Sequence, residues 1–245
     1  MSKHNSQDTI YASPQDKTVG FVFDKNVVDV FPDMINRSVP GYSTIINLIG
    51  VLAEQHAKPA TRLYDLGCSL GAASLSMRHR VIEDDCEIIS VDNADAMIER
   101  LNKILERDSS KTPVQTVCSD IQDVTVSNAS VVVMNFTLQF IPLPERQNII
   151  AKIYAGLNEG GCLILSEKLA FPDNLENETQ IDFHHAFKKS NGYSDLEIAQ
   201  KRNALENVLI PETKETHMQR LNDAGFSQVL SWFQCFNFAS FIAIK

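Results

Sequence analysis

An acidic residue and two glycines, spaced Asp-x-Gly-x-x-x-Gly, follow a short apolar run near residue 65. They are Asp65, Gly67 and Gly71. Glycine tolerates positive φ and has no Cβ, so a strand that turns through glycines into a helix lets backbone N–H groups approach a ligand closely. The spacing differs from the Gly-x-Gly-x-x-Gly pattern of dinucleotide-binding proteins. The stretch therefore predicts a nucleoside-binding turn that runs from Asp65 through Cys68 and Ser69.

Polar residues also close three later apolar runs, as Asp92-Asn93, Asp120-Ile121 and Asn135. Asp92 lies 25 positions beyond Gly67, where a carboxylate can accept hydrogen bonds from two ribose hydroxyls. Asp120 can accept from an adenine amino group, and Ile121 can pack on the ring. Acidic residues at strand ends can also serve solubility alone. Their occurrence together with the glycine turn, however, favours a binding site for an adenine nucleoside.

Regularly alternating strands and helices must position these residues. Apolar runs separated by helical patterns predict five strands, at 62–66, 87–91, 114–118, 131–134 and 162–166. Strands buried on both faces and joined by helices form a parallel sheet, whose ligands lie at the carboxyl ends of the strands. A helix over 216–224 and two closing strands at 228–235 and 238–244 add a late hairpin.

The flanking segments predict a lid around this sheet. Residues 1–20 are polar and are expected to form a mobile leader, and 21–245 a single domain with an N-terminal helical lid over about 21–57. Within the lid, a helical pattern at 27–31 is interrupted by Pro32, and Ser43 can cap the next helix. Tyr42 is a candidate lid residue, although an ordinary packed tyrosine fits equally well.

A helical insertion over about 169–213 breaks the strand–helix alternation. It carries His184-His185 and a basic group interrupted by acids: Lys188, Lys189, Lys201 and Arg202. Adjacent histidines do not share a helix face, so no metal site is expected.

Composition narrows the classes of function. The formal net charge of −9 argues against direct nucleic-acid binding, which Lys and Arg dominate. The five cysteines are widely spaced, which indicates free thiols in a reducing compartment. No apolar run approaches the roughly 20 residues that span a bilayer. We expect a cytoplasmic protein.

The strand-end residues and the terminal hairpin together resemble the seven-stranded S-adenosylmethionine-dependent methyltransferase fold, a three-layer αβα sandwich with a mostly parallel sheet. A NAD dehydrogenase is disfavoured because the three-glycine pattern is absent. Six motifs, several of them outside this common core, resemble the CmoA family of carboxy-S-adenosyl-L-methionine synthases. These motifs are Val30–Ile35, Arg37–Ser43, Tyr64–Ala73, Asn135–Phe140, Asn191–Ser194 and Trp232–Phe238. The chain departs from the family mainly in residues 1–19 and 169–179.

The resemblance implies an enzyme that converts S-adenosyl-L-methionine and prephenate to carboxy-S-adenosyl-L-methionine and phenylpyruvate. It further implies a homodimer, and a partner tRNA carboxymethyltransferase that modifies a wobble uridine. The family chemistry suggests that the methyl carbon beside the sulfonium becomes nucleophilic as a ylide and captures the carboxyl group that prephenate loses.

The resemblance also assigns a binding set. The implied residues are Tyr42, Gly67, Cys68, Ser69, Asp92, Asn93, Asp120, Ile121, Asn135 and Arg202. Arg202 comes from the resemblance alone. In that role it holds the new carboxylate, for which a planar guanidinium offers a bidentate fork that lysine cannot copy. No general base is identified. Two other interpretations stay open on this fold: a small-molecule methyltransferase, and a catalytically silent S-adenosylmethionine-binding partner in a tRNA-modifying complex.

Overall fold

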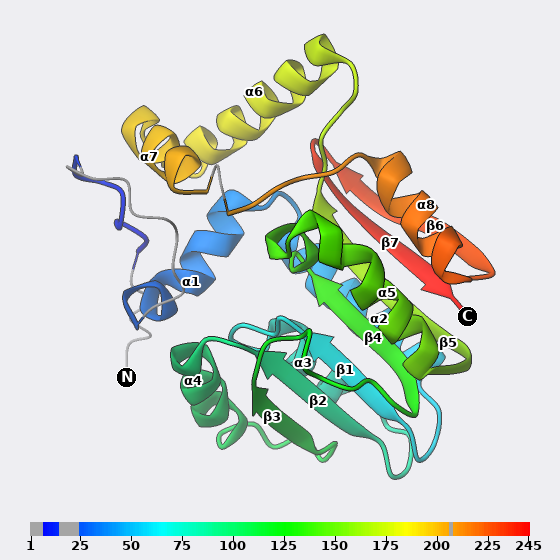
Figure 1. Cartoon of the computed structure of the whole chain (residues 1–245). Coiled ribbons are helices and arrows are strands. Elements are labelled where there is room, and N and C mark those ends of the chain that lie inside the picture. Colours follow the sequence, from blue (N-terminus) through cyan, green and yellow to red (C-terminus); the bar gives the residue numbers. More distant parts are fainter. Residues whose placement is uncertain (1–6, 15–24, 206–207) are drawn as a thin grey trace.

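A seven-stranded sheet forms the centre of the molecule (Figure 1), in a computed structural model that describes residues 7–14, 25–205 and 208–245. The strand order is β3-β2-β1-β4-β5-β7-β6. β7 pairs antiparallel with both of its neighbours, and the other pairs are parallel. The strands are β1 Arg62–Leu66, β2 Glu87–Asp92, β3 Val114–Cys118, β4 Ala129–Asn135, β5 Leu157–Lys168, β6 Gln228–Cys235 and β7 Phe238–Ile244. The predicted mostly parallel sheet with a late hairpin is confirmed.

Helices cover both faces of the sheet because its inner strands are apolar on both. Along β4, Val131 and Val133 face one core, and Val132 and Met134 face the other, as the two-residue period of a strand requires. The first core includes residues of α2 and α3, and the second includes residues of α5 and α8. The helices are α1 Lys25–Ser38, α2 Tyr42–His56, α3 Ala72–Arg80, α4 Asp95–Leu105, α5 Leu143–Gly156, α6 Asn174–Ser190, α7 Asp195–Leu205 and α8 Lys214–Ala224, with a 3-10 turn at Leu138–Phe140. The predicted three-layer αβα sandwich is thus confirmed.

Two sequence predictions in the N-terminal helices are wrong, and α8 begins at Lys214 rather than at residue 216. α1 continues through Pro32. Proline removes one helical hydrogen bond, but buried side chains on both sides of it, among them Val28 and Met34, hold the helix against its neighbours. α2 begins at Tyr42 with Gly41 as its N-cap at φ 74°, so Ser43 lies inside the helix and does not cap it.

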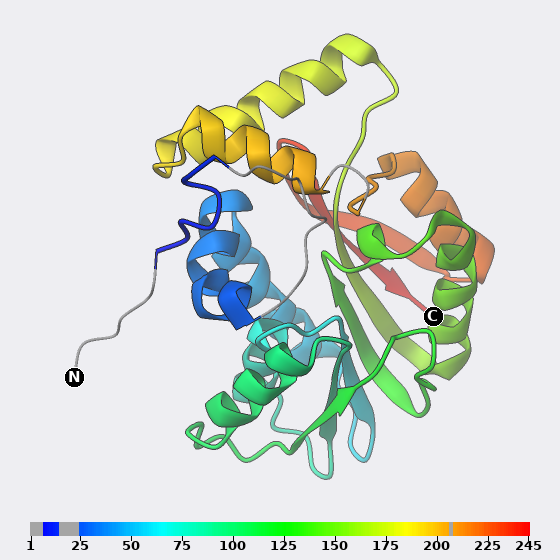
Figure 2. The same ribbon diagram turned by 60° about the vertical axis from the view of Figure 1, so that its left-hand side comes forward.

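The helical insertion stands over the carboxyl ends of the strands (Figures 1 and 2). It consists chiefly of α6 and α7, and α1 lies beneath it. No helix among the described residues is long and apolar enough to cross a membrane.

Residues 7–14, which we call the N-terminal strap, pack between α1 and α7. Asp8 is 2% exposed and accepts a hydrogen bond from the hydroxyl of Tyr193 at 2.5 Å. Gln200 of α7 donates to the carbonyl oxygens of Tyr11 and Ser13. This part of the predicted leader is therefore anchored to the domain, and the rest, 1–6 and 15–20, lies outside the described residues.

Candidate active site

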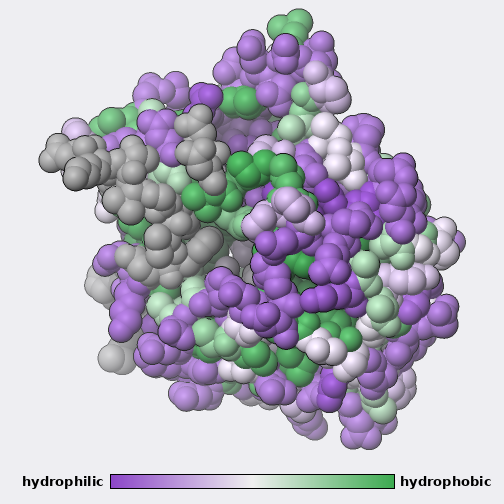
Figure 3. Space-filling model, viewed as in Figure 1, coloured by the Kyte–Doolittle hydropathy of each residue, from purple (hydrophilic) through white to green (hydrophobic). Residues whose placement is uncertain are grey.

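A pocket of about 600 Å³ opens at the carboxyl ends of the parallel strands. Its floor is the boundary between β1 and β4, where the strand order reverses direction, the place at which open α/β sheets bind ligands. Hydrophobic residues gather near the middle of this face, between the insertion above and the sheet below (Figure 3). The structure brings every predicted site residue to the lining of this one pocket: Tyr42, Gly67, Cys68, Ser69, Asp92, Asn93, Asp120, Ile121, Asn135 and Arg202.

The turn after β1 is shaped by glycines at two close approaches. Gly67 has φ +82°, and a Cβ there would lie 2.3 Å from Oγ1 of Thr137. Gly71 has φ +75° and forms the N-cap of α3, and its Cβ would lie 2.3 Å from Leu101. A side chain at either position would have to displace a packed neighbour, so the sequence spacing corresponds to real steric demands.

Two carboxylates, the buried Asp65 and the partly buried Asp92, fix this turn. Asp65 accepts from the backbone N–H and the hydroxyl of Ser74, at 2.9 and 2.6 Å, and so ties β1 to α3. Burial raises the pKa of Asp65 to about 6. Asp92 accepts from the N–H of Ser69 at 2.8 Å and from the N–H of Ala94 at 3.0 Å, and burial raises its pKa as well. Because each oxygen of Asp92 is already aimed by one N–H group, the carboxylate is held rigidly at the pocket wall.

The end of β3 contributes a polar and an apolar group side by side. The amide of Asn93 donates to Oδ1 of Asp120 at 2.7 Å. Ile121 is partly buried against the core. This corner therefore offers both an acceptor and an apolar surface, as a flat heterocycle with an amino group requires.

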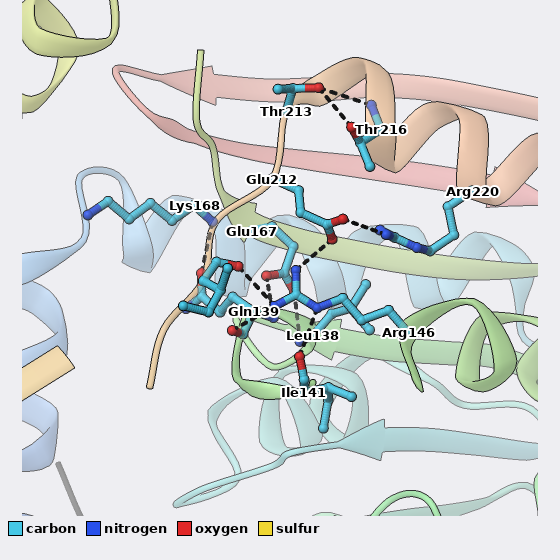
Figure 4. A network of polar contacts seen from close by, with 11 residues as sticks. Leu138, Gln139, Ile141, Arg146, Glu167, Lys168, Glu212, Thr213, Thr216 and Arg220 are labelled. Atoms are coloured by element: carbon cyan, nitrogen blue, oxygen red, sulfur yellow. Dashed lines mark hydrogen bonds and ion pairs between the residues drawn. The ribbon is translucent and has the colours of Figure 1, made fainter. Parts of the chain in front are cut away.

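The loop after β4 is held by an internal network (Figure 4). Glu167, fully buried on β5, accepts from the N–H groups of Leu138 and Gln139, both at 2.9 Å. Arg146 of α5 donates to the carbonyl oxygens of Gln139 and Ile141. The loop that starts at Asn135 is thereby fixed from two elements.

Asn135 itself presents an unused acceptor. Its Oδ1 is buried and has no hydrogen-bond partner among the described residues. A buried polar atom without a partner is rare and costly, so this oxygen is placed for a ligand. The phenol of Tyr42, which also lines the pocket, has a raised pKa because of burial and the nearby carboxylate of Asp65.

The part of the pocket lined by the end of β5 and by the insertion, which we call the roof, carries basic groups. Among them, the sequence analysis assigned a binding role only to Arg202. The lining also includes Lys168 from the end of β5 together with His184, His185, Lys188 and Lys201 from the insertion. The Nε2–H of His184 donates to the carbonyl oxygen of Ser38 at 2.8 Å, and burial lowers the pKa of His184 to about 2. The four-residue spacing of His184 and Lys188 places both on one helix face, which is the signal that could have found them. In the described part of the chain no group of three His, Cys, Asp or Glu side chains could hold a metal ion.

Comparison with known proteins places this geometry in a family. The chain is 59% identical over 239 residues to a carboxy-S-adenosyl-L-methionine synthase of Trichlorobacter lovleyi, covering 97% of this chain and 98% of that one. It is 55% identical over 244 residues to a protein of the same name in Vibrio cholerae, covering 100% and 99%. The chain belongs to the carboxy-S-adenosyl-L-methionine synthase family.

A family model described as a methyltransferase domain matches residues 63–161. This range holds β1 to the start of β5 and thus the glycine turn and the ends of the first four strands. The helical insertion and Arg202 lie beyond this range, as do α1 and α2.

Solved structures of low sequence identity support the fold. A putative S-adenosylmethionine-dependent methyltransferase of Methanococcus maripaludis superposes with a TM-score of 0.58 at 18% identity, covering 95% of this chain and 97% of that one. A magnesium protoporphyrin IX methyltransferase of Synechocystis, solved with bound S-adenosylmethionine, gives a TM-score of 0.56 at 15% identity, covering 92% and 86%.

Proposed function

We propose that this protein is a carboxy-S-adenosyl-L-methionine synthase that uses S-adenosyl-L-methionine and prephenate. The observation that carries the proposal is the coexistence, in one pocket, of a nucleoside-type floor and a cationic roof that includes Arg202. A methyltransferase needs only the floor, whereas a carboxylated product also needs a cation beside the former methyl carbon.

The floor suits S-adenosyl-L-methionine group by group. Asp92 is the acceptor for the ribose hydroxyls, and Asp120 with Ile121 is the adenine corner. The unpartnered oxygen of Asn135 is an acceptor for the ammonium of the amino-acid part. Gly67 to Ser69 leave room for the backbone to approach the ligand closely.

The roof suits the carboxyl group. The Arg202 side chain is exposed to the pocket and forms no hydrogen bond or ion pair with the residues that the structure describes. A guanidinium can bind a carboxylate through two parallel hydrogen bonds. Arg202 therefore binds the carboxyl group that the methyl carbon acquires.

The reaction balances without a protein base. The carboxyl group of prephenate transfers to the methyl carbon, which gives up one proton, and the hydroxide that leaves as the ring becomes aromatic takes that proton as water. The protein supplies proximity, a pocket sheltered from water and electrostatic stabilisation. A homodimer and a tRNA carboxymethyltransferase that consumes the product complete the proposal.

The direct test is mass spectrometry of the nucleosides formed from S-adenosyl-L-methionine and prephenate. We expect a product in which a carboxyl group replaces one hydrogen, accompanied by phenylpyruvate. Methyl transfer to an added acceptor, with no carboxylated nucleoside, would instead identify a methyltransferase.

Arg202→Ala and Arg202→Lys test the assigned residue. A charge-assisted bidentate contact contributes about 1.5–3 kcal/mol, so both variants should bind carboxy-S-adenosyl-L-methionine at least about 10-fold more weakly by calorimetry, with little change for S-adenosyl-L-methionine. Arg100→Lys, on the exposed side of α4, is the control. Equal affinity of Arg202→Ala and wild type for the carboxylated nucleoside would remove Arg202 from this role.

A further inference from the structure

The roof of the pocket holds more positive charge than one carboxylate requires. Lys168 extends from the end of β5 away from the Glu167 network, as Figure 4 shows. Lys188 comes from α6 and Arg202 from α7, and all three line the same pocket. The lining contributed by β5, α6 and α7 contains no acidic residue.

These cations lie close enough to act on one another. The pKa of Lys168 is lowered first by burial and then by the charge of Arg202. The pKa of His185 is lowered by burial and then by Lys188, Arg202 and Lys168 in turn. The imidazole of His185 is thus within electrostatic range of all three cations. The three cations therefore lie around the same part of the pocket.

Lys188 is the most constrained member. It is 7% exposed, and neither its ammonium nor that of Lys168 forms a hydrogen bond or ion pair within the described ranges 7–14, 25–205 and 208–245. Burial and the charges of Lys201 and Lys168 lower the pKa of Lys188 to about 7, against a smaller opposing effect of the Asp8 carboxylate, which is paired with Lys201. A buried ammonium that lacks an ion pair is unfavourable, so an anion is the natural occupant of the space that it faces.

Lys201 lies in the same region, but its ammonium has polar partners. Its ammonium donates to the hydroxyl of Ser38 at 3.1 Å and lies 3.8 Å from a carboxylate oxygen of Asp8. Its charge is therefore used by the N-terminal strap. Lys168 and Lys188 have no equivalent partner.

We propose that Lys168 and Lys188 form a second anion subsite, beside Arg202, which binds the carboxylate of the donor that is not transferred. The inference rests on the proposed function and deepens it. A donor with one carboxylate at Arg202 and another at the lysine pair is fixed at two points, so the site selects dicarboxylates whose two acidic groups span this distance. After transfer, the keto-acid product keeps only the contact with the lysines.

Lys188→Met and Lys168→Met test the subsite, since methionine keeps the length of an apolar stem and removes the charge. Binding of phenylpyruvate is measured by calorimetry in the presence of S-adenosylhomocysteine, and KM is measured for prephenate. Loss of a charge-assisted contact predicts at least about a 10-fold rise in the phenylpyruvate Kd and in the prephenate KM. The Kd of S-adenosyl-L-methionine should stay within about 2-fold.

Lys189→Met is the matched control. Lys189 neighbours Lys188 on α6, but its side chain is exposed and pairs with Asp195. This variant should bind both acids as wild type does. A purely structural role for Lys188 predicts a lower Tm in Lys188→Met, whereas an unpaired buried charge predicts an unchanged or higher Tm.

Arg202→Ala is the complementary test. It should weaken the binding of carboxy-S-adenosyl-L-methionine and leave the binding of phenylpyruvate unchanged, whereas the lysine variants should weaken the binding of phenylpyruvate. Unaltered phenylpyruvate affinity in both lysine variants, or a parallel loss of S-adenosyl-L-methionine affinity, would overturn the subsite. Failure of the wild-type enzyme to form a carboxylated nucleoside would overturn the proposed function instead, because the calorimetric binding experiment does not depend on turnover.

Discussion

At the scale of single residues, the site is defined by groups whose freedom has been removed before any ligand arrives. The carboxylate of Asp92 is aimed by the N–H groups of Ser69 and Ala94. Gly67 lies against Thr137 in a left-handed conformation. Such preorganisation reduces the ordering that binding requires, and it makes the turn after β1 intolerant of small changes.

Gly67→Ala tests this intolerance against Gly160→Ala. Both glycines have positive φ, +82° and +73°, but a Cβ at Gly160 has nothing within 4 Å, whereas at Gly67 it meets Thr137 atoms at 2.3, 2.4 and 2.9 Å. The backbone strain of about 1–2 kcal/mol is common to both variants, and overpacking adds about 1–3 kcal/mol to Gly67→Ala alone.

We therefore expect a larger fall in the free energy of unfolding for Gly67→Ala, measured by urea denaturation. The affinity for S-adenosyl-L-methionine should fall by at least about 10-fold in that variant and stay unchanged in Gly160→Ala. Equal losses in the two variants would mean that the contact with Thr137 is of no consequence.

At the scale of elements, the loop after β4 is positioned by its neighbours rather than by itself. Glu167 on β5 binds two N–H groups of this loop, and Arg146 on α5 binds two of its carbonyl oxygens. Arg146 is also paired with Glu212, which precedes α8, at 2.6 Å. β5 and α5 thus fix the loop that follows Asn135, and Glu212 holds Arg146 in place.

Glu167→Gln should loosen this loop. One acceptor oxygen becomes a donor that faces an N–H group, so a buried hydrogen bond is lost at about 1–3 kcal/mol. For a domain of this size the Tm should fall by about 2–4 °C per kcal/mol in a calorimetric scan.

Glu145→Gln on α5 is the control for that change, because the Glu145 side chain is exposed and, among the residues that the structure describes, accepts a hydrogen bond only from Gln122. This variant should leave the Tm and the affinity for S-adenosyl-L-methionine unaltered. An equally stable Glu167→Gln variant would show that water or a shifted side chain replaces the network.

The strand ends could be predicted from the sequence because parallel topology brings them together whatever the rest of the chain does. Asp92 and Asn135 end buried strands, and Asp120 follows the edge strand β3. Ligands in such sheets bind at the carboxyl ends of the strands. The roof could not be predicted in this way. Lys168 and Lys188 come from elements whose relative orientation depends on tertiary packing, and the passage of α1 through Pro32 depends on contacts that no local pattern encodes.

At the scale of the whole molecule, the N-terminal strap joins α1 to the helical insertion. Arg37 of α1 donates to the carbonyl oxygens of Asp8 and Asn191, and its guanidinium lies 3.9 Å from the centre of the Tyr193 ring. Tyr193 donates to the carboxylate of Asp8. The strap, α1 and the start of α7 are thereby connected through a small buried cluster.

Tyr193→Phe should release the strap from the insertion. The carboxylate of Asp8 loses a short hydrogen bond, so hydrogen exchange should accelerate in residues 7–14 and 195–205 while the sheet stays protected. Tyr154→Phe is the control, since the Tyr154 ring packs on Phe226 far from the strap. Unchanged exchange in Tyr193→Phe would show that the contacts of Gln200 and Arg37 suffice.

The anchoring of the strap also imposes an order of events on the ribosome. Asp8 is made among the first residues, but its partners Tyr193 and Lys201 are made near the end of the chain. At a synthesis rate of roughly 5–20 residues per second, the strap waits on the order of 10–40 s before they emerge. The floor of the pocket can form during that interval, whereas the roof closes only when nearly the whole chain has been translated. A nascent chain stalled before residue 193 would therefore have neither Tyr193 nor Lys201 to hold the strap, and it would lack Arg202.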